Sequence, residues 1–294
     1  MTLSELKNKL DAYERLMRLD KPIGILLLLW PTLWALWAVS YGWPSFMVLA
    51  IFVLGTVLMR SAGCVINDYA DRDFDGHVER TRHRPLATRE VSTKEALWLA
   101  ASLSLLAFLL ILPLNKMVLL LSLPALFLAG SYPFTKRFLA IPQAYLGVAF
   151  GFGIPMAYAT FLGTVPPTAW LMLAANVFWA IAYDTEYAMV DREDDLKLGI
   201  KTSAITFGRY DVAAVMCCYA MTLGLLAWFG QILHYGIFYY ASLVVAAAIV
   251  TYHYTLIRHR ERDKCFKAFL HNTWIGAVIF LGFVAELNLK PHLF

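Results

Sequence analysis

The sequence predicts an all-α, polytopic membrane protein with nine transmembrane helices, and three observations support that fold class. Of the 294 residues, 60% are hydrophobic and 16% are charged, whereas a soluble domain carries about 45 to 50% apolar and about 25% charged residues. Apolar stretches recur along the whole chain, and lysine and arginine gather in alternate connections between them. This composition excludes a soluble enzyme and a disordered chain, and the net charge of +4 does not indicate a nucleic-acid partner.

Each apolar stretch is long enough to form a membrane-spanning helix, which needs about 20 residues. The nine stretches are residues 22–41, 44–65, 95–113, 117–132, 142–162, 168–183, 211–230, 235–257 and 271–289. The third and fourth are separated only by Leu114, Asn115 and Lys116, and Pro124 interrupts the fourth. Merging these two would change the parity of the count, and with it the side on which the C-terminus lies.

The distribution of basic residues predicts the orientation. With a cytoplasmic N-terminus, 22 of the 25 lysines and arginines fall in cytoplasmic segments, as the positive-inside rule requires. Those segments are residues 1–21, 66–94, 133–141, 184–210 and 258–270. Residues 1–21 are expected to be an amphipathic helix on the inner membrane surface, because their apolar residues recur at helical spacing. Residues 22–294 then form a single transmembrane domain.

Acidic residues mark the candidate functional site. Ten of the 21 acids lie in two short windows, each directly after an apolar stretch and on the predicted cytoplasmic side. The members are Asp68, Asp71, Asp73 and Asp75, then Asp184, Glu186, Asp191, Glu193, Asp194 and Asp195. Residues 71–75 and 191–195 match acid for acid at the first, third and fifth positions. Charge at the edge of a membrane is costly, so a functional role is the first hypothesis for both windows.

Helical phase separates the acids by expected role, since successive residues are rotated by about 100°. In the first window one face carries Asn67, Asp68, Asp71 and Asp75, and in the second a narrow stripe carries Asp184, Asp191 and Asp195 with Asp194 beside it. The remaining acids point elsewhere and are expected to be solvated charges at the ends of helices. These are Asp73, Glu186 and Glu193.

Two carboxylate faces repel themselves unless a cation joins them, and oxygen ligands of this kind suit Mg²⁺. Because Mg²⁺ commonly shares its ligands with a substrate phosphate, the expected substrate carries a phosphate or diphosphate group. Basic residues in the same loops agree with a diphosphate: Arg72, Arg80, Arg82, Arg84, Lys136, Arg137, Arg192, Lys197 and Lys201. The alternative is that each acidic run is only a solvated helix end balanced by these neighbours.

These motifs resemble those of a known family. The segment Gly63-Cys-Val-Ile-Asn67-Asp68-Tyr-Ala-Asp71-Arg-Asp-Phe-Asp75 resembles the NDxxDxxxD signature of the UbiA family of intramembrane prenyltransferases. Residues 183–195 resemble the second, DxxxD-containing motif of that family. Three further segments, residues 80–86, 131–137 and 199–205, are similar to the branch that acts on 4-hydroxybenzoate in ubiquinone biosynthesis. The resemblance extends over nearly the whole chain.

The resemblance implies nine transmembrane helices around a central cavity, with the two acid motifs facing each other at its cytoplasmic mouth. By matching position, Asn67, Asp71, Asp75, Asp191 and Asp195 are expected to hold Mg²⁺, and Asp71, Asp75, Asp191 and Asp195 are the expected catalytic residues. Further substrate-binding residues are expected at Asn67, Asp68, Arg72, Lys136, Arg137, Asp184 and Arg192.

The implied reaction moves a polyprenyl group from polyprenyl diphosphate to the ring carbon ortho to the hydroxyl of 4-hydroxybenzoate, with release of diphosphate. Asp191 is the expected base for the ring proton, and Lys136 or Arg137 is expected to pair either with the benzoate carboxylate or with the diphosphate. The expected location is a bacterial inner membrane, with the active site opening toward the cytoplasm. Two alternatives stay open: a family member with another aromatic acceptor, and a cation-coupled transporter. The sequence leaves prenyl chain length and oligomeric state unassigned.

Overall fold

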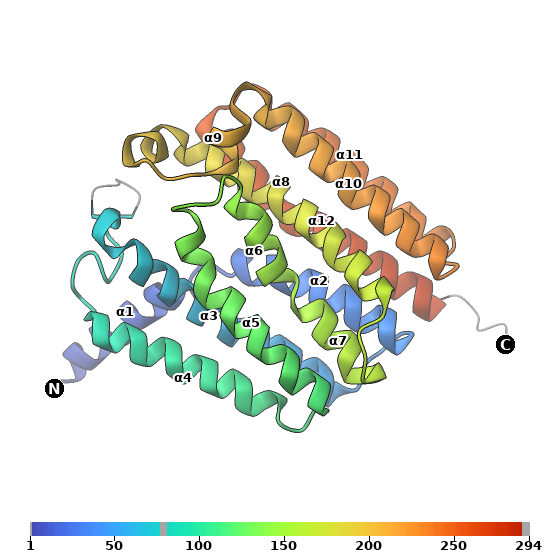
Figure 1. Cartoon of the computed structure of the whole chain (residues 1–294), viewed down its shortest axis with the longest axis horizontal. Helices are drawn as coiled ribbons and strands as arrows, with labels where there is room; N and C mark the ends of the chain where they lie inside the picture. The colour runs from blue at the N-terminus through green and yellow to red at the C-terminus, as the bar shows by residue number, and fades with distance from the viewer. Residues whose placement is uncertain (1, 77–80, 290–294) are drawn as a thin grey trace.

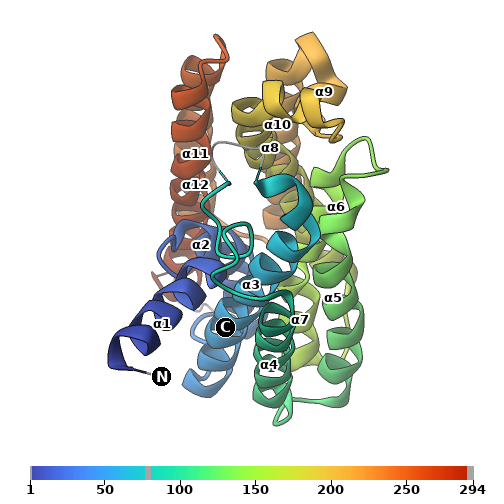
Figure 2. The same ribbon diagram turned by 90° about the vertical axis from the view of Figure 1, so that its left-hand side faces the viewer.

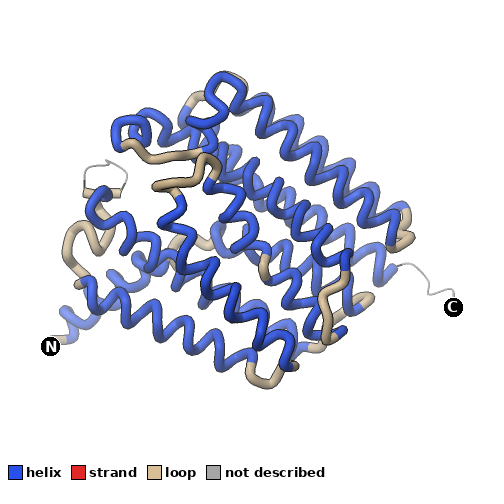
Figure 3. The backbone as a smooth tube through the Cα atoms, in the orientation of Figure 1, coloured by secondary structure: helices blue, strands red, loops and turns tan. Residues whose placement is uncertain are grey.

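The computed structural model describes residues 2–76 and 81–289, except for the side chains of Phe74, Asp75 and Leu198. Within those residues every regular element is a helix, and Figure 3 shows helices joined by short loops. In chain order they are α1 (Leu3–Met17), α2 (Ile23–Ser40), α3 (Phe46–Asp75), α4 (Thr93–Ile111), α5 (Lys116–Thr135), α6 (Pro142–Gly151), α7 (Gly153–Leu162), α8 (Pro167–Leu198), α9 (Ser203–Phe207), the 3₁₀ turn η1 (Gly208–Tyr210), α10 (Asp211–Ile232), α11 (Ile237–Ile257) and α12 (Arg262–Leu289).

The all-α membrane fold is confirmed. Among the described residues, eight helical segments are long and apolar enough to cross a membrane. The remaining expected span, residues 168–183, lies in α8, which is 32 residues long and packs against α6, α10 and α12. Helix α8 is not among the eight, and it carries buried polar residues such as Asn176 and Glu186. Length and packing therefore place α8 beside the eight as the ninth span.

Two prolines act differently from one another. Pro124 was expected to interrupt a span, yet α5 runs through it without a break. The expected span 142–162 is instead divided at Phe152 into α6 and α7. Pro155 explains this division. Proline has no N–H to donate to the carbonyl of the residue four positions earlier, here Gly151, and its ring clashes with that carbonyl.

The separation of α4 from α5 is confirmed, and Asn115 is its cause. The Asn115 side chain caps α5 by accepting a hydrogen bond from the Val118 N–H at 3.2 Å. Its amide also donates to the Ala159 carbonyl of α7 at 2.6 Å. Asn115 therefore caps the start of α5 and also ties that end of α5 to α7.

The helices form two groups with α2, α6 and α7 between them (Figure 1). One group contains α8, α10, α11 and α12, and the other contains α3, α4 and α5. The main core lies around Trp34, Trp179 and Tyr219, which are almost completely buried. Glycine permits the closest packing, since a Cβ atom at Gly147 of α6 would lie 2.8 Å from the Val177 Cα of α8.

Helix α1 lies beside α3 at the edge of the bundle (Figure 2). A capping box between Thr2 and Glu5 begins it, and Arg18 in the left-handed conformation ends it. Ala12 and Leu16 are buried against a small second core that includes Val65. The helix therefore packs on the bundle through one face, while Leu3, Leu6 and Leu10 stay exposed.

Candidate active site

One large cavity lies inside the bundle, with a volume of about 1770 Å³. Its deep part is apolar and is lined by Leu27, Ile51, Phe52, Ile111, Phe152 and Met156. Its other end is polar, because the N-terminal end of α2 and the C-terminal ends of α3, α5 and α8 meet there. The cavity therefore combines a charged mouth with an apolar interior.

A single face of α3 lines the cavity from end to end. The residues on that face recur at intervals of three and four: Phe52, Thr56, Met59, Gly63, Asn67 and Asp71. Asp73 points away and its side chain is 71% exposed, as its helical phase predicts. Asp75 is the last residue of α3, and its side chain lies outside the described part of the structure. Arg80 also lies outside the described residues.

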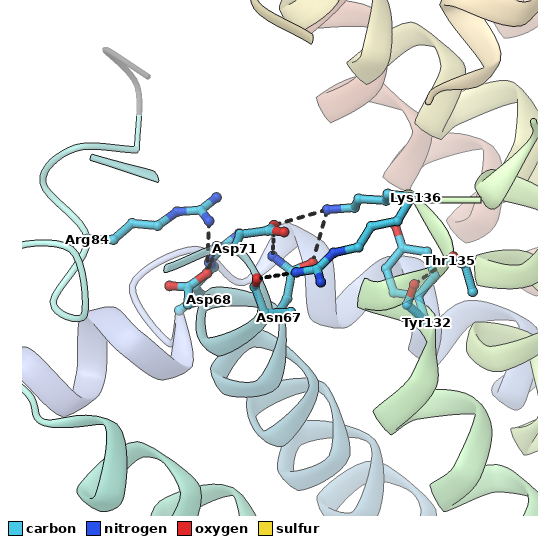
Figure 4. A network of polar contacts seen from close by, with 10 residues as sticks. Asn67, Asp68, Asp71, Arg84, Tyr132, Thr135 and Lys136 are labelled. Carbon is cyan, nitrogen blue, oxygen red and sulfur yellow. Dashed lines mark hydrogen bonds and ion pairs between the residues drawn. The ribbon is translucent and has the colours of Figure 1, made fainter. Parts of the chain in front are cut away.

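Lys136, at the end of α5, joins the acid face of α3 (Figure 4). Its ammonium group donates to Asn67 Oδ1 and to Asp71 Oδ2, both at 3.2 Å. The Asn67 amide donates to the same Asp71 oxygen at 3.2 Å. All three side chains line the cavity. The Lys136 ammonium group therefore lies beside Asp71, where it could also donate to a diphosphate oxygen.

Asp68 has a different position from its neighbours in the motif. Its side chain is 1% exposed, and one oxygen accepts from Arg18 at 2.6 Å and lies 3.1 Å from Arg84. Arg18 ends α1, and Arg84 lies in the loop between α3 and α4. Asp68 therefore ties these two segments to α3 at the mouth, and both arginines line the cavity.

Ion pairs at the surface strengthen the same junction. Arg15 of α1 pairs with Glu90 in the loop before α4, and Lys9 donates to the Glu90 carbonyl at 3.0 Å. The hydrogen bonds from Arg15 and Thr88 lower the pKa of the Glu90 carboxyl. Arg15 also lines the cavity, so the α1 junction forms part of its mouth.

Helix α8 supplies the second group of acids. Asp184, Asp191, Asp194 and Asp195 line the same cavity as Asn67 and Asp71. Glu193 points out, is 77% exposed and pairs with Arg262 at 3.0 Å. The structure thus brings α3 and α8 acids to one cavity.

Three predicted substrate-binding arginines do not line that cavity. Arg72 donates to the Tyr69 carbonyl at 2.7 Å, and Arg137 donates to the Ala70 carbonyl at 3.0 Å. Arg192 pairs at 3.1 Å with Asp211, a fully buried carboxylate that also binds Arg260. Arg72 and Arg192 each follow a cavity-facing aspartate, so helical rotation by about 100° turns them away.

Arg60 is the residue that sequence reasoning missed. It lies within the α3 span and lines the cavity beside Tyr132 and Tyr183. Its guanidinium donates to Cys64, and its buried Nε has no partner among the described residues. Gly24 makes room for it, because a Cβ there would lie 2.5 Å from Arg60 Nη2. The signal was present, since an arginine inside a span is costly and usually functional.

The donor set fits Mg²⁺ that binds together with a diphosphate. Within the described residues, no three His, Cys, Asp or Glu side chains lie close enough to hold one ion by themselves. Mg²⁺ usually takes only one or two carboxylates and completes its shell with waters and substrate phosphates. Asn67 and Asp71 on one side and Asp191 and Asp195 on the other offer the oxygen ligands that this arrangement needs.

Comparison with known proteins now identifies the family. Residues 28–280 match the UbiA prenyltransferase family. The chain belongs to this family. The relatives include a 4-hydroxybenzoate octaprenyltransferase of an Azoarcus species, which is 71% identical over 97% of this chain and 99% of its own length. The 4-hydroxybenzoate octaprenyltransferase of Thiobacillus denitrificans is 70% identical over 99% of this chain and 98% of its own.

Solved structures of other UbiA proteins have the same fold. The apo structure of a UbiA homolog from Aeropyrum pernix has a TM-score of 0.77 and 25% identity, and covers 90% of this chain and 98% of its own. A UbiA homolog from Archaeoglobus fulgidus, solved bound to GPP and Mg²⁺, has a TM-score of 0.71 and 21% identity over 94% of this chain and 99% of its own. The multi-span helical fold is therefore that of the UbiA family.

Proposed function

We propose that this chain transfers a polyprenyl group from polyprenyl diphosphate to 4-hydroxybenzoate, at the ring carbon ortho to the hydroxyl, and releases diphosphate as a step of ubiquinone biosynthesis. The observation that carries the proposal is one cavity with acids at its mouth, a partly buried arginine within the α3 span and an apolar interior. Full-length similarity to 4-hydroxybenzoate octaprenyltransferases at 71% and 70% identity supports this choice of acceptor.

The diphosphate binds at the mouth in this proposal. Asn67, Asp71 and Asp75 of α3 and Asp191 and Asp195 of α8 would hold Mg²⁺, and Asp184 would bind beside them. Bound Mg²⁺ would neutralise the charge that builds on the departing diphosphate. Lys136, which contacts Asn67 and Asp71, supplies a further positive charge at the same place. The structure of the Archaeoglobus fulgidus homolog bound to GPP and Mg²⁺ supports this assignment.

The prenyl chain occupies the apolar interior. Once the allylic C–O bond breaks, the carbocation needs a site from which water is excluded. The walls below the acids supply it, because they are formed by apolar side chains such as Phe52, Phe152 and Met156. The same walls bind the isoprenoid units through the burial of apolar surface.

Arg60 binds the benzoate carboxylate, in place of Lys136 or Arg137. A carboxylate that enters an apolar cavity needs a cationic partner, and Arg60 is a cavity-lining cation within the membrane span. With the carboxylate fixed there, the ring lies beside Tyr132 and Tyr183. Asp191 would accept the proton that the ring carbon loses after attack on the prenyl cation.

The proposed location is a bacterial inner membrane, with the acid mouth toward the cytoplasm. The positive-inside distribution supports this orientation, since 22 of 25 basic residues fall on the side of the mouth. The exposed Leu3, Leu6 and Leu10 of α1 would enter the membrane surface on that side. A reporter enzyme fused after Phe294 should be active in the periplasm, and activity only in the cytoplasm would contradict the orientation.

The deciding experiment uses the purified protein in lipid nanodiscs. It receives Mg²⁺, 4-hydroxybenzoate and a polyprenyl diphosphate, and product mass and diphosphate release are measured. We expect a 3-polyprenyl-4-hydroxybenzoate and an equal amount of diphosphate. Parallel reactions contain other aromatic acceptors, because a family member with a different acceptor would release diphosphate only with one of those. Absence of product with 4-hydroxybenzoate would reject the proposed acceptor.

A further inference from the structure

A buried polar cluster lies on the side of α8 that faces away from the cavity. Glu186 is fully buried, although it was expected to be a solvated charge. It accepts hydrogen bonds from the Tyr219 hydroxyl at 2.9 Å and from the Asn272 amide at 2.8 Å, and it lies 3.3 Å from His253 Nδ1. Tyr219, His253 and Asn272 are also buried, and the four residues are here called the Glu186 cluster.

The cluster joins α8 to three helices at once. Tyr219 comes from α10, His253 from α11 and Asn272 from α12. A second bond to α12 lies seven residues earlier in α8, where the Trp179 indole donates to Asn272 Oδ1 at 2.9 Å. Each partner approaches from a different helix, so the contacts fix α8 against rotation about its own axis as well as against sliding.

Helical phase relates this cluster to the active site. Glu186 follows Asp184 by two residues and precedes Asp191 by five, so it is rotated by about 200° from the first and about 140° from the second. Asp184 and Asp191 line the cavity, whereas no member of the Glu186 cluster does. The cluster cannot touch a substrate in the cavity, but any rotation of α8 that breaks it also moves the aspartates.

We propose that Glu186 is a positioning residue, which sets the rotation of α8 and thereby places Asp184 and Asp191 opposite Asp71 of α3. This inference rests on the proposed function, because the acids of both helices must reach one diphosphate. Apolar packing alone tolerates small rotations of a helix. A buried carboxylate with three polar partners does not, since each broken hydrogen bond leaves a buried polar group unsatisfied.

The kinetic consequence is specific. In Glu186→Ala, misplacement of the α8 acids should lower kcat by about ten- to a hundredfold and raise the Mg²⁺ concentration for half-maximal rate. The KM for 4-hydroxybenzoate should change less than kcat, because the carboxylate partner Arg60 and the ring neighbour Tyr132 lie on α3 and α5, and only Tyr183 lies on α8. Glu186→Gln keeps the side-chain length and an oxygen for Tyr219, so it should recover most of the loss. Tyr219→Phe removes one hydroxyl and should give a smaller effect of the same kind.

Glu286 provides the matched control. It is also buried, and it accepts hydrogen bonds from the backbone N–H groups of Gly236 and Tyr239, where α11 begins. Glu286→Ala therefore also removes a buried, hydrogen-bonded carboxylate, but one whose hydrogen bonds are to the start of α11. It should lower the unfolding temperature without changing the Mg²⁺ dependence.

A distance measurement tests the proposal without any enzymatic activity. Spin labels are attached through Asp73→Cys on α3 and Glu193→Cys on α8, two exposed positions outside the proposed site. Cys217, the exposed cysteine among the described residues, is replaced by serine. Pulsed electron paramagnetic resonance should give one narrow distance distribution for the otherwise unchanged protein and for Glu286→Ala, and a shifted or broadened one for Glu186→Ala.

Each outcome decides between positioning and general stability. An unchanged distribution in Glu186→Ala, or the same broadening in Glu286→Ala, would overturn the proposal. Failure of the protein to prenylate 4-hydroxybenzoate would reject the proposed function instead, and the distances would still report on α8. If Glu186→Ala does not fold, Tyr219→Phe carries the same comparison, because it removes one hydrogen-bond partner of Glu186.

Discussion

Lys136 Nζ lies 3.2 Å from Asp71 Oδ2, so the end of α5 is tied to the acid face of α3 by an ion pair at the cavity mouth. Both side chains are about a quarter exposed, at 25% and 22%, and both line the cavity. A lysine in this position can stabilise Asp71 before the diphosphate binds and then turn to a diphosphate oxygen, since its three N–H donors are on a flexible chain.

Lys136→Met should therefore weaken the reaction through the prenyl diphosphate. The substitution keeps much of the side-chain volume and removes the charge, and a hydrogen bond to a charged group contributes about 1.5 to 3 kcal/mol. We expect kcat/KM for the prenyl diphosphate to fall by about one to two orders of magnitude, with little change in the KM for 4-hydroxybenzoate. Steady-state kinetics in nanodiscs measures both constants. A rise confined to the KM for 4-hydroxybenzoate would show that Lys136 binds the acceptor instead.

The aspartates should separate into two classes by helical phase. Asp71→Asn and Asp191→Asn remove a ligand charge from the cavity without changing volume, so turnover should fall by orders of magnitude and added Mg²⁺ should not restore it. Asp73→Asn and Glu193→Gln should be mild, because those side chains are 71% and 77% exposed. Diphosphate release measures turnover, and circular dichroism checks folding. Equal losses at Asp71 and Asp73 would contradict this division.

Arg60 and Arg137 give a direct comparison of two candidate carboxylate partners. Arg60→Met should raise the KM for 4-hydroxybenzoate by about one to two orders of magnitude, the value of a charge-assisted hydrogen bond. Arg137→Met should leave that KM unchanged, because the Arg137 guanidinium donates to the Ala70 carbonyl and does not line the cavity. Benzoate analogues without the carboxylate provide the control, since their weak binding should not depend on Arg60.

The sequence predicted the spans well because hydropathy reports directly on the membrane, and Asn115 shows why even a three-residue break was visible. It could not distinguish Glu186 from Glu193. These residues are seven apart and share nearly one helical face, yet Glu186 is fully buried and Glu193 is 77% exposed. Which of them is buried between helices depends on where α8 extends beyond its neighbours. Arg60 was missed for a related reason. The cavity that it lines is formed by several packed helices, and a single sequence does not show which residues face it.

Gly55 should control the length of prenyl chain that the cavity accepts. It lies twelve residues before Asn67 on α3, about 18 Å deeper along the helix at 1.5 Å per residue. It lines the cavity, and apart from its two chain neighbours and the adjoining backbone of α3, no described residue has an atom within 4 Å of a Cβ placed there. The Cβ of a leucine there therefore meets open space, and a leucine should also favour the helix, because glycine is about 1 kcal/mol less favourable than alanine in a helix interior.

Gly55→Leu should thus narrow the deep part of the cavity and leave the mouth unchanged. We expect kcat/KM for octaprenyl diphosphate to fall, while the value for geranyl diphosphate, whose chain ends nearer the acids, stays the same. Gly63→Leu is the matched comparison, because Gly63 also has open space but lies only one helical turn before Asn67. It should lower the rate with both substrates. Competition between the two diphosphates, with the products distinguished by mass, measures the ratio of the two kcat/KM values. An equal loss with both substrates in Gly55→Leu would show that the chain does not pass this glycine, and the apolar end of the cavity near Ile51 and Met156 would then have no part in binding the tail.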